Sequence, residues 1–280
     1  MYRNKLKGSH EQKEQDAEDR TLQREINMAR NIQSTLLNGE VPSFAGGEVV
    51  GSTVPARLIG GDYYDFYPLL DGKIRIVIGD VMGKGIPAAM LMILTRGAFR
   101  SAAERTQGPG DNLTAMNQAI YKDLRALKSF VTLFCADWNP NTRTLTYANA
   151  GHNIPLWISA KTKKVSELPR TKGIMVGGLP NQVYQEESIK LGDCDTIFFY
   201  TDGIVEAQNG SSEQYQIERL IETLTKNQEK PVDEIEKCVM NSIHQFTDGT
   251  QQKDDITMVI LKVEREQSDN PSFDSSKCLK

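Results

Sequence analysis

The stretch IRIVIGDVMGKGIPAAM, residues 74–90, changes character in its middle. Its first half is rich in β-branched residues and predicts a buried strand. The strand pattern breaks at Asp80, glycines follow at positions 83 and 85, and an apolar helical pattern resumes at Ile86. A carboxylate at the end of a buried strand, just before a turn whose glycines leave the backbone exposed, indicates that something binds there.

The chain around this stretch mixes strand and helix patterns from residue 48 to residue 263. Strand-like runs are EVVGSTV, YYDFYPL, KIRIVIGD, SFVTLFCADWN, TLTYANA, IPLWISA, VYQEESIKL, DTIFFYT and DITMVILKV; helix-like runs cover residues 86–104, 112–127 with Asp111 as N-cap, 212–227 and 232–246. Strands come in clusters joined by tight turns, and the helices come in pairs. This order predicts an α+β domain of antiparallel sheets covered by helices, and not a doubly wound parallel sheet.

Residues 11–37 predict one helix, because they are rich in Glu, Gln, Arg and Lys and contain no Gly or Pro. Its stripe of Leu22, Ile26, Ala29, Gln33 and Leu36 allows two interpretations. The helix either lies on its own domain, or pairs with a second copy or another protein as a short coiled coil, with Gln33 as a polar register residue.

Three parts are therefore expected along the chain. Residues 1–40 form a regulatory or dimerisation helix, residues 45–264 form the main domain, and the polar segment 265–280 forms a disordered tail.

Composition narrows the class of protein. The net charge of −4 and the pI of about 5.6 give no general electrostatic reason to bind nucleic acid or an anionic membrane. The sequence lacks a signal-like apolar core, and its longest apolar run is too short to span a membrane. Four cysteines without close spacing suggest reduced thiols. We expect a soluble cytoplasmic protein.

Aspartates border four β-rich runs. Asp62 lies in IGGDYYD, Asp80 in VIGDVMGKG, Asp202 in IFFYTDG, and Asp254 with Asp255 in QKDDITMVI. Taken singly, each has a structural interpretation as a turn, a bend or a strand entry. If the strand ends coincide, however, the carboxylates repel one another unless a cation neutralises them, and Mg²⁺ and Mn²⁺ prefer such oxygen ligands. Two ions about 3.5–4 Å apart can bind phosphate and activate water, so that hydrolysis of a phosphate ester needs no protein nucleophile.

The sequence resembles the SpoIIE/RsbU-type branch of the PPM metal-dependent serine/threonine phosphatases. The resemblance rests on IGGDYYDFY, IVIGDVMGKGIPAAMLM, FVTLFCADW, LTYANAGHNIPLWI, FFYTDGIVEAQN and DDITMVIL, which follow in the family's order across residues 50–263. It implies an α-β-β-α sandwich of two antiparallel sheets flanked by helix pairs, with an N-terminal helical extension.

The resemblance also implies a centre of two Mn²⁺ or Mg²⁺ ions. Asp80 would bridge both ions, Asp202 and Asp254 would complete one metal site, and the backbone carbonyl of Val81 would serve the other. Asp62 would lie behind these ligands or bind through water.

Two motif residues leave questions. His152 is a turn residue or a catalytic acid, and Gln216 stands where the family usually has a glycine after an aromatic residue. No counterpart is identified of the phosphate-gripping arginine of many type 2C enzymes, so the metal is expected to hold the phosphate.

By resemblance, the function is metal-dependent protein serine/threonine phosphatase activity in a bacterial partner-switching pathway. The implied substrate is a phosphorylated STAS-domain anti-sigma factor antagonist, and residues 11–37 would engage a sensor protein or a second copy. The alternative is a conditionally active or catalytically weak phosphatase fold that serves as a regulatory scaffold.

The segment MGKGIPAA also satisfies a dinucleotide-binding G-x-G-x-x-A pattern, although no strand and acidic residue follow at the expected spacing.

Overall fold

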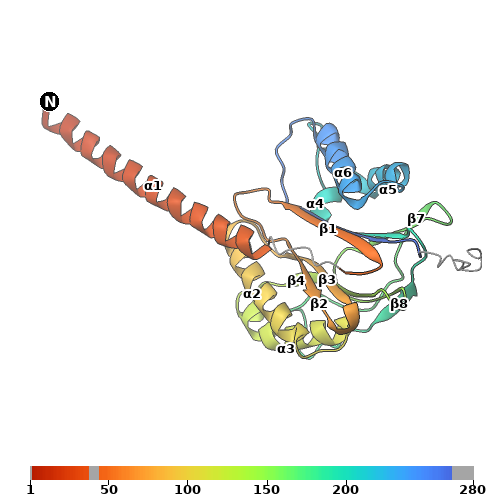
Figure 1. Cartoon of the computed structure of the whole chain (residues 1–280). Coiled ribbons are helices and arrows are strands. Elements are labelled where there is room, and N and C mark those ends of the chain that lie inside the picture. The colour runs from red at the N-terminus through yellow and green to blue at the C-terminus, as the bar shows by residue number, and fades with distance from the viewer. Residues whose placement is uncertain (1, 38–43, 267–280) are drawn as a thin grey trace, which may run out of the picture.

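The computed structural model describes residues 2–37 and 44–266, which contain two five-stranded sheets and their flanking helices (Figure 1). The β10 sheet has the order β1 (Gly47–Val54), β10 (Ile256–Val263), β9 (Thr196–Tyr200), β6 (Leu156–Ser159) and β7 (Lys164–Glu167). The β3 sheet has the order β2 (Tyr63–Pro68), β3 (Ile74–Val81), β4 (Val131–Asn139), β5 (Thr144–Ala150) and β8 (Glu187–Lys190). Neighbouring strands pair antiparallel in both sheets.

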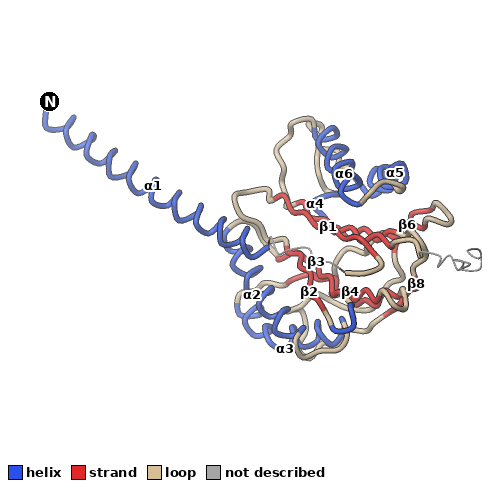
Figure 2. Tube along the Cα trace, viewed as in Figure 1, coloured by secondary structure: helices blue, strands red, loops and turns tan. Residues whose placement is uncertain are grey.

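Helix pairs cover the two outer faces, as the two red strand layers between blue helices in Figure 2 show. Helices α2 (Ile86–Ala103) and α3 (Pro109–Ala126) pack on the β3 sheet, and α5 (Gln216–Asn227) and α6 (Val232–Thr247) pack on the β10 sheet. The expected α-β-β-α sandwich is confirmed. Because β3 pairs antiparallel with β4, the described segment 74–139 does not form the parallel β-α-β unit that the dinucleotide-binding alternative requires.

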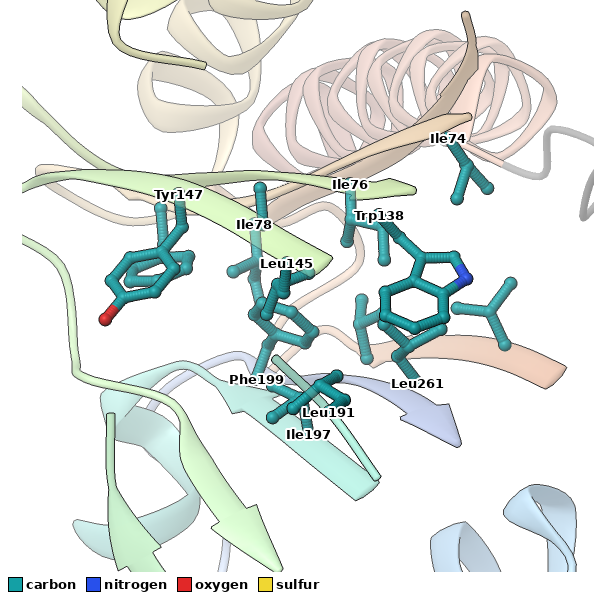
Figure 3. Packing of buried hydrophobic residues seen from close by; sticks show 14 of the residues in the cluster. Ile74, Ile76, Ile78, Trp138, Leu145, Tyr147, Leu191, Ile197, Phe199 and Leu261 are labelled. Atoms are coloured by element: carbon teal, nitrogen blue, oxygen red, sulfur yellow. The ribbon is translucent and has the colours of Figure 1, made fainter. Parts of the chain in front are cut away.

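The side chains of β3 alternate strictly between the two faces of its sheet. This alternation explains how the space between the sheets is filled. Ile74, Ile76 and Ile78 point between the sheets, where they join Phe199 of β9 and Leu261 of β10 (Figure 3). The intervening positions face α2 and α3, since successive side chains of a strand point to opposite faces. Continuing the even-numbered series places residue 80 on the inter-sheet side, at the rim of the core.

Helix α2 is fixed to β2 by an ion pair between the buried Asp65 carboxylate and the partly exposed Arg100. The Arg100 Nε and Nη2 atoms donate to the two carboxylate oxygens of Asp65 at 2.7 and 2.8 Å. The Tyr63 hydroxyl donates to the same carboxylate at 3.0 Å. This bidentate geometry fixes both the position and the rotation of α2 on the sheet.

Helix α1 (Tyr2–Leu37) begins nine residues before the predicted start and projects from the domain as a single rod (Figure 1). Its C-terminal end packs on the domain, where Leu37 meets the cluster under α2 and α3. Within residues 2–37 and 44–266, no helix combines the length and apolar character needed to cross a bilayer.

Other boundaries differ from the predictions for local reasons. Helix α3 starts at Pro109 after Gly108, so Asp111 lies in its first turn and is not the N-cap. Proline is favoured at that first position because its missing N–H has no partner in a helix. The prediction also missed β7 and the short helix α4 (Asp202–Val205). Most of the predicted tail, residues 267–280, lies outside the described residues.

Helix α5 begins at Gln216, four residues later than predicted, because Gln208 and Gln214 first form an isolated antiparallel bridge. Gln216 has φ 66°, in the left-handed region that glycine adopts freely. The glycine that the family usually carries here therefore matches a conformational need, which this chain meets with a side chain under strain.

We predict that Gln216→Gly stabilises the protein by about 0.5–1 kcal/mol, because relief of a left-handed strain of about 1–2 kcal/mol outweighs the added entropy of the unfolded chain. Urea denaturation measures this difference. Gln228→Gly is the matched control, since Gln228 has φ −58° and should lose about 0.5–1 kcal/mol instead. Equal destabilisation of both variants would contradict the strain at Gln216.

Candidate metal centre

The predicted aspartates come from both sheets and lie at one edge of the sandwich. Asp80 is the penultimate residue of β3, and Asp62 directly precedes β2. Asp202 opens α4 just after β9, and Asp254 lies two residues before β10. Three of them, Asp80, Asp202 and Asp254, are partly exposed, whereas Asp62 is only 4% exposed.

These carboxyl groups interact with one another electrostatically. Burial raises the pKa of Asp80 to about 7, and the charges of Asp202, Asp254 and Asp255 add to that rise. The pKa of Asp202 is also raised, first by burial and then by Asp254 and the neighbouring Glu206. Such mutual effects require that the acidic groups of the two sheets lie near one another. The convergence predicted from the sequence is therefore present.

Asp62 lies deeper than the other three. Burial raises its pKa well above the usual range, and the charge of Asp80 adds to this effect. Hydrogen bonds oppose the rise, among them one that the Thr201 hydroxyl donates to Asp62 Oδ2 at 2.8 Å. Thr201 in turn accepts from the backbone N–H of Thr257 at 3.1 Å. Asp62 is thus tied to the ends of β9 and β10.

Asp255 differs from the other aspartates because it bonds to backbone N–H groups, a role that the sequence did not predict. Its Oδ1 accepts from the Ala56 N–H at 2.8 Å, and its Oδ2 accepts from the Gly61 N–H at 2.7 Å. A Cβ on Gly60 would lie only 2.4 Å from Asp255 Oδ2. Asp255 therefore clamps the loop that leads into Asp62, and Gly60 permits the close approach. Two adjacent aspartates before a strand were the only sequence signal.

The backbone carbonyl of Val81 borders the same loop. A Cβ on Gly61 would lie 3.1 Å from Val81 O and 3.0 Å from the Cβ of Ala88. The donor set near Asp80 thus consists of carboxylate oxygens and one peptide oxygen, which suits hard ions such as Mg²⁺ and Mn²⁺. Within the described residues, no three Asp, Glu, His or Cys side chains are already gathered as closely as a bound ion requires.

Two basic side chains, neither predicted, border the acidic cluster. The Lys84 ammonium lies 2.7 Å from Asp254 Oδ2 and 2.7 Å from the Lys253 carbonyl oxygen. Arg57 reaches the same turn, since its Nη1 lies 3.4 Å from the position that a Cβ on Gly85 would take. A cationic group therefore approaches this edge from the loop before β2, in addition to the one in the turn after β3.

A cleft of about 530 Å³ opens beside Asp254. Its walls come from α4, the C-terminal end of α6 and the loop 249–254; Lys84, Glu206, Gln208, His244 and Asp254 contribute polar side chains. The volume is in the range of small-ligand sites. The acidic edge is thus bordered by a cleft of a size that can hold a ligand.

His152 lies beneath the site. Its side chain is buried, its Nδ1 lies 2.9 Å from the Thr132 hydroxyl, and its Nε2 makes no hydrogen bond of normal geometry. Burial lowers the pKa of His152 to about 4, so the ring is neutral at pH 7. A neutral, buried ring favours the structural interpretation over the catalytic acid.

Comparisons with known proteins agree with this geometry. The family described as Stage II sporulation protein E (SpoIIE) matches residues 70–264. The phosphoserine phosphatase RsbU of Bacillus subtilis is 32% identical over 243 residues, which are 86% of this chain and 70% of that protein.

Solved structures share the fold. The SiaA-PP2C domain of Pseudomonas aeruginosa superimposes with a TM-score of 0.77 at 24% identity, over 89% of this chain and 99% of that domain. RsbX, solved in complex with magnesium, gives a TM-score of 0.60 at 17% identity, over 80% of this chain and 99% of RsbX.

We predict that His152 makes stability dependent on pH between about 4 and 6.5. The unfolded ring, with an ordinary pKa near 6.5, binds more protons there than the buried ring, so stability is full above pH 6.5 and falls as pH falls. The loss between pH 7 and pH 5 should be about 2 kcal/mol.

His152→Asn, which can still bond to Thr132, should lack this part of the loss in urea denaturation at the two pH values. If His152 were the catalytic acid, the variant would instead lose the alkaline limb of the pH–rate profile.

Proposed function

The chain belongs to the SpoIIE family, the SpoIIE/RsbU-type branch of the PPM serine/threonine phosphatases, and on this basis we propose that it dephosphorylates a phosphorylated STAS-domain protein in a bacterial partner-switching pathway. The observation that carries the proposal is the group of carboxyls from two sheets that raise one another's pKa at an open edge. The similarity to RsbU supports phosphoserine as the substrate residue.

We assign two Mn²⁺ or Mg²⁺ ions to this edge. Asp80 would hold both, Asp202 and Asp254 would complete one site, and the Val81 carbonyl would serve the other. The partly exposed Asp80, Asp202 and Asp254 suit direct ligands, whereas the buried Asp62 suits a supporting role. When bound, the ions would supply charge neutralisation for the phosphoryl group and an activated water.

The chain's own residues orient the reactants. Asp255 and Thr201 fix Asp62, and the glycines before Asp62 bring the loop against the Val81 carbonyl. Arg57 is a donor that can bind phosphate oxygens, as guanidinium groups commonly do. The cleft beside Asp254 would accept the polypeptide that carries the phosphoserine.

We predict that Asp80→Asn lowers Mn²⁺-dependent kcat/KM by at least about a thousandfold, because several kcal/mol of transition-state stabilisation depend on the bridging charge. The assay follows phosphate release from a panel of phosphorylated STAS proteins, with Mn²⁺, Mg²⁺ or chelator.

Because asparagine removes one of the repelling charges, Asp80→Asn should be at least as heat-stable as the original protein in chelator. The exposed Asp123→Asn on α3 is the matched control and should keep full activity. Full activity of the Asp80 variant would refute the metal assignment. Tight STAS binding without phosphate release from the unaltered protein would favour the regulatory scaffold.

We also propose that α1 is the regulatory handle of the domain. Gln33 is buried in a two-way contact, where its Nε2 donates to Gly60 O at 2.7 Å and its Oε1 accepts from Gly60 N–H at 3.2 Å. Gln33, which the coiled-coil interpretation takes as a polar register residue, thus forms its hydrogen bonds within the chain. Gly60 precedes Gly61, which Asp255 holds, so the helix end is linked directly to the acidic edge.

The part of α1 beyond this contact offers apolar surface to a partner. Leu22, Met28 and Ile32 are 54%, 64% and 58% exposed along the rod. Exposed large apolar side chains on an isolated helix favour pairing with a sensor protein or with a second copy.

We predict that Gln33→Leu lowers the phosphatase rate several-fold and speeds amide hydrogen exchange in residues 59–62, because the N–H and C=O of Gly60 lose their buried partners. Gln23→Leu, an exposed position on the same helix, is the control and should change neither. Unchanged exchange and rate in the Gln33 variant would show that the contact does not couple the helix to the site.

A further inference from the structure

The turn between β3 and α2 carries a lysine that pairs with an acidic residue of the other sheet. Lys84 lies in this turn, 170 positions from Asp254, and its ammonium contacts Asp254 Oδ2 and the neighbouring Lys253 carbonyl oxygen at 2.7 Å each. The same ammonium also lowers the pKa of Asp202. One cation thus offsets charge on two of the carboxyl groups proposed as metal ligands.

The ion pair between Lys84 and Asp254 can open and close easily. Lys84 and Asp254 are 42% and 31% exposed in their side chains, and an ion pair of this exposure contributes little to stability because solvent screens it. Gly83 and Gly85, which flank the lysine, both have positive φ, at 108° and 71°. The pair therefore depends on a glycine-bounded turn and a long side chain, and neither is held by packing in a core.

Space is available for the lysine to leave. Both Lys84 and Asp254 line the cleft of about 530 Å³ between α4, α6 and the loop 249–254. A rotation of the Lys84 side chain about its own bonds can release Asp254 and keep the ammonium in this cleft. Neither strand has to move.

We propose that Lys84 is an internal counter-ion of Asp254 that a divalent ion must displace, so that the lysine lowers the affinity of the site for metal. This inference rests on the proposed function, since it takes Asp254 as a ligand. The lysine opposes binding in two ways, because it occupies the carboxylate oxygen and because it places a like charge beside the incoming ion.

Lys253 provides a natural comparison. It carries the same charge and is adjacent to Asp254 in the chain, but its ammonium bonds to the side-chain oxygen of Gln208 and, among residues 2–37 and 44–266, to no carboxylate. A general effect of positive charge near the site would appear at both lysines. Displacement from Asp254 would appear at Lys84 alone.

Isothermal titration calorimetry with MnCl₂ tests the proposal on the full chain. Lys84→Met should bind Mn²⁺ about three- to fivefold more tightly than the unaltered protein, which corresponds to the loss of a partly exposed ion pair. Lys84→Arg, which keeps the charge and can keep the pair, should stay close to the unaltered affinity. Lys253→Met should change it by less than about twofold.

Chemical labelling gives a second readout that needs no variant. Acetylation of the Lys84 amine by an N-hydroxysuccinimide ester, followed by mass spectrometry, should rise several-fold when Mn²⁺ replaces chelator, because the amine leaves its two oxygen partners. Lys122, exposed on α3, serves as the internal reference and should not change.

The outcomes separate this proposal from the proposed function. If the unaltered protein binds Mn²⁺ and releases phosphate, while Lys84 labelling is constant and Lys84→Met binds Mn²⁺ no more tightly than Lys253→Met, the counter-ion role alone is overturned. If the unaltered protein binds no Mn²⁺ at millimolar concentration, both proposals fail.

Discussion

Carboxyl groups from two sheets repel one another at the edge where Asp80 lies, and the surrounding structure holds them together against that repulsion. The inter-sheet core supplies the main restraint, because Ile74, Ile76 and Ile78 fix β3 against β9 and β10. Hydrogen bonds supply the rest, since Thr201 and Asp255 tie the loop of Asp62 to the β10 sheet. The stability of the packed layers thus maintains a local arrangement that is unfavourable by itself.

Contacts of helices α2 and α1 connect the acidic edge to the outside of the domain. Helix α2 begins five residues after Val81 and is fixed to β2 through Asp65 and Arg100, so its position affects the turn that carries Lys84. Helix α1 reaches the loop before Asp62 through Gln33 and Gly60. Both α1 and α2 therefore contact segments that border the acidic edge. A partner that binds either helix can act on the site with few intervening contacts.

The sequence predicted the layers and the acidic positions because both follow local rules. The alternation in β3 and the glycines around Asp80 and Asp62 can be recognised in short stretches of sequence. The family motifs then gave the order of these stretches along the chain. The partners of those residues were not predictable in this way. Gln33 meets Gly60 across 27 positions and Lys84 meets Asp254 across 170, and no periodicity encodes such pairs. Gln33 also fitted a helical stripe that allowed either packing on the chain's own domain or pairing with a partner, and its hydrogen bonds with Gly60 are of the first kind.

The alternation of β3 leaves this segment intolerant of changes in length. Deleting or inserting one residue between positions 74 and 80 would turn every following side chain to the opposite face. The carboxylate of Asp80 would then lie beneath α2 among apolar neighbours, while aliphatic side chains would line the rim that now carries charge. Loops elsewhere tolerate insertions and deletions. In β3, one residue gained or lost would remove both the packing between the sheets and the acidic edge.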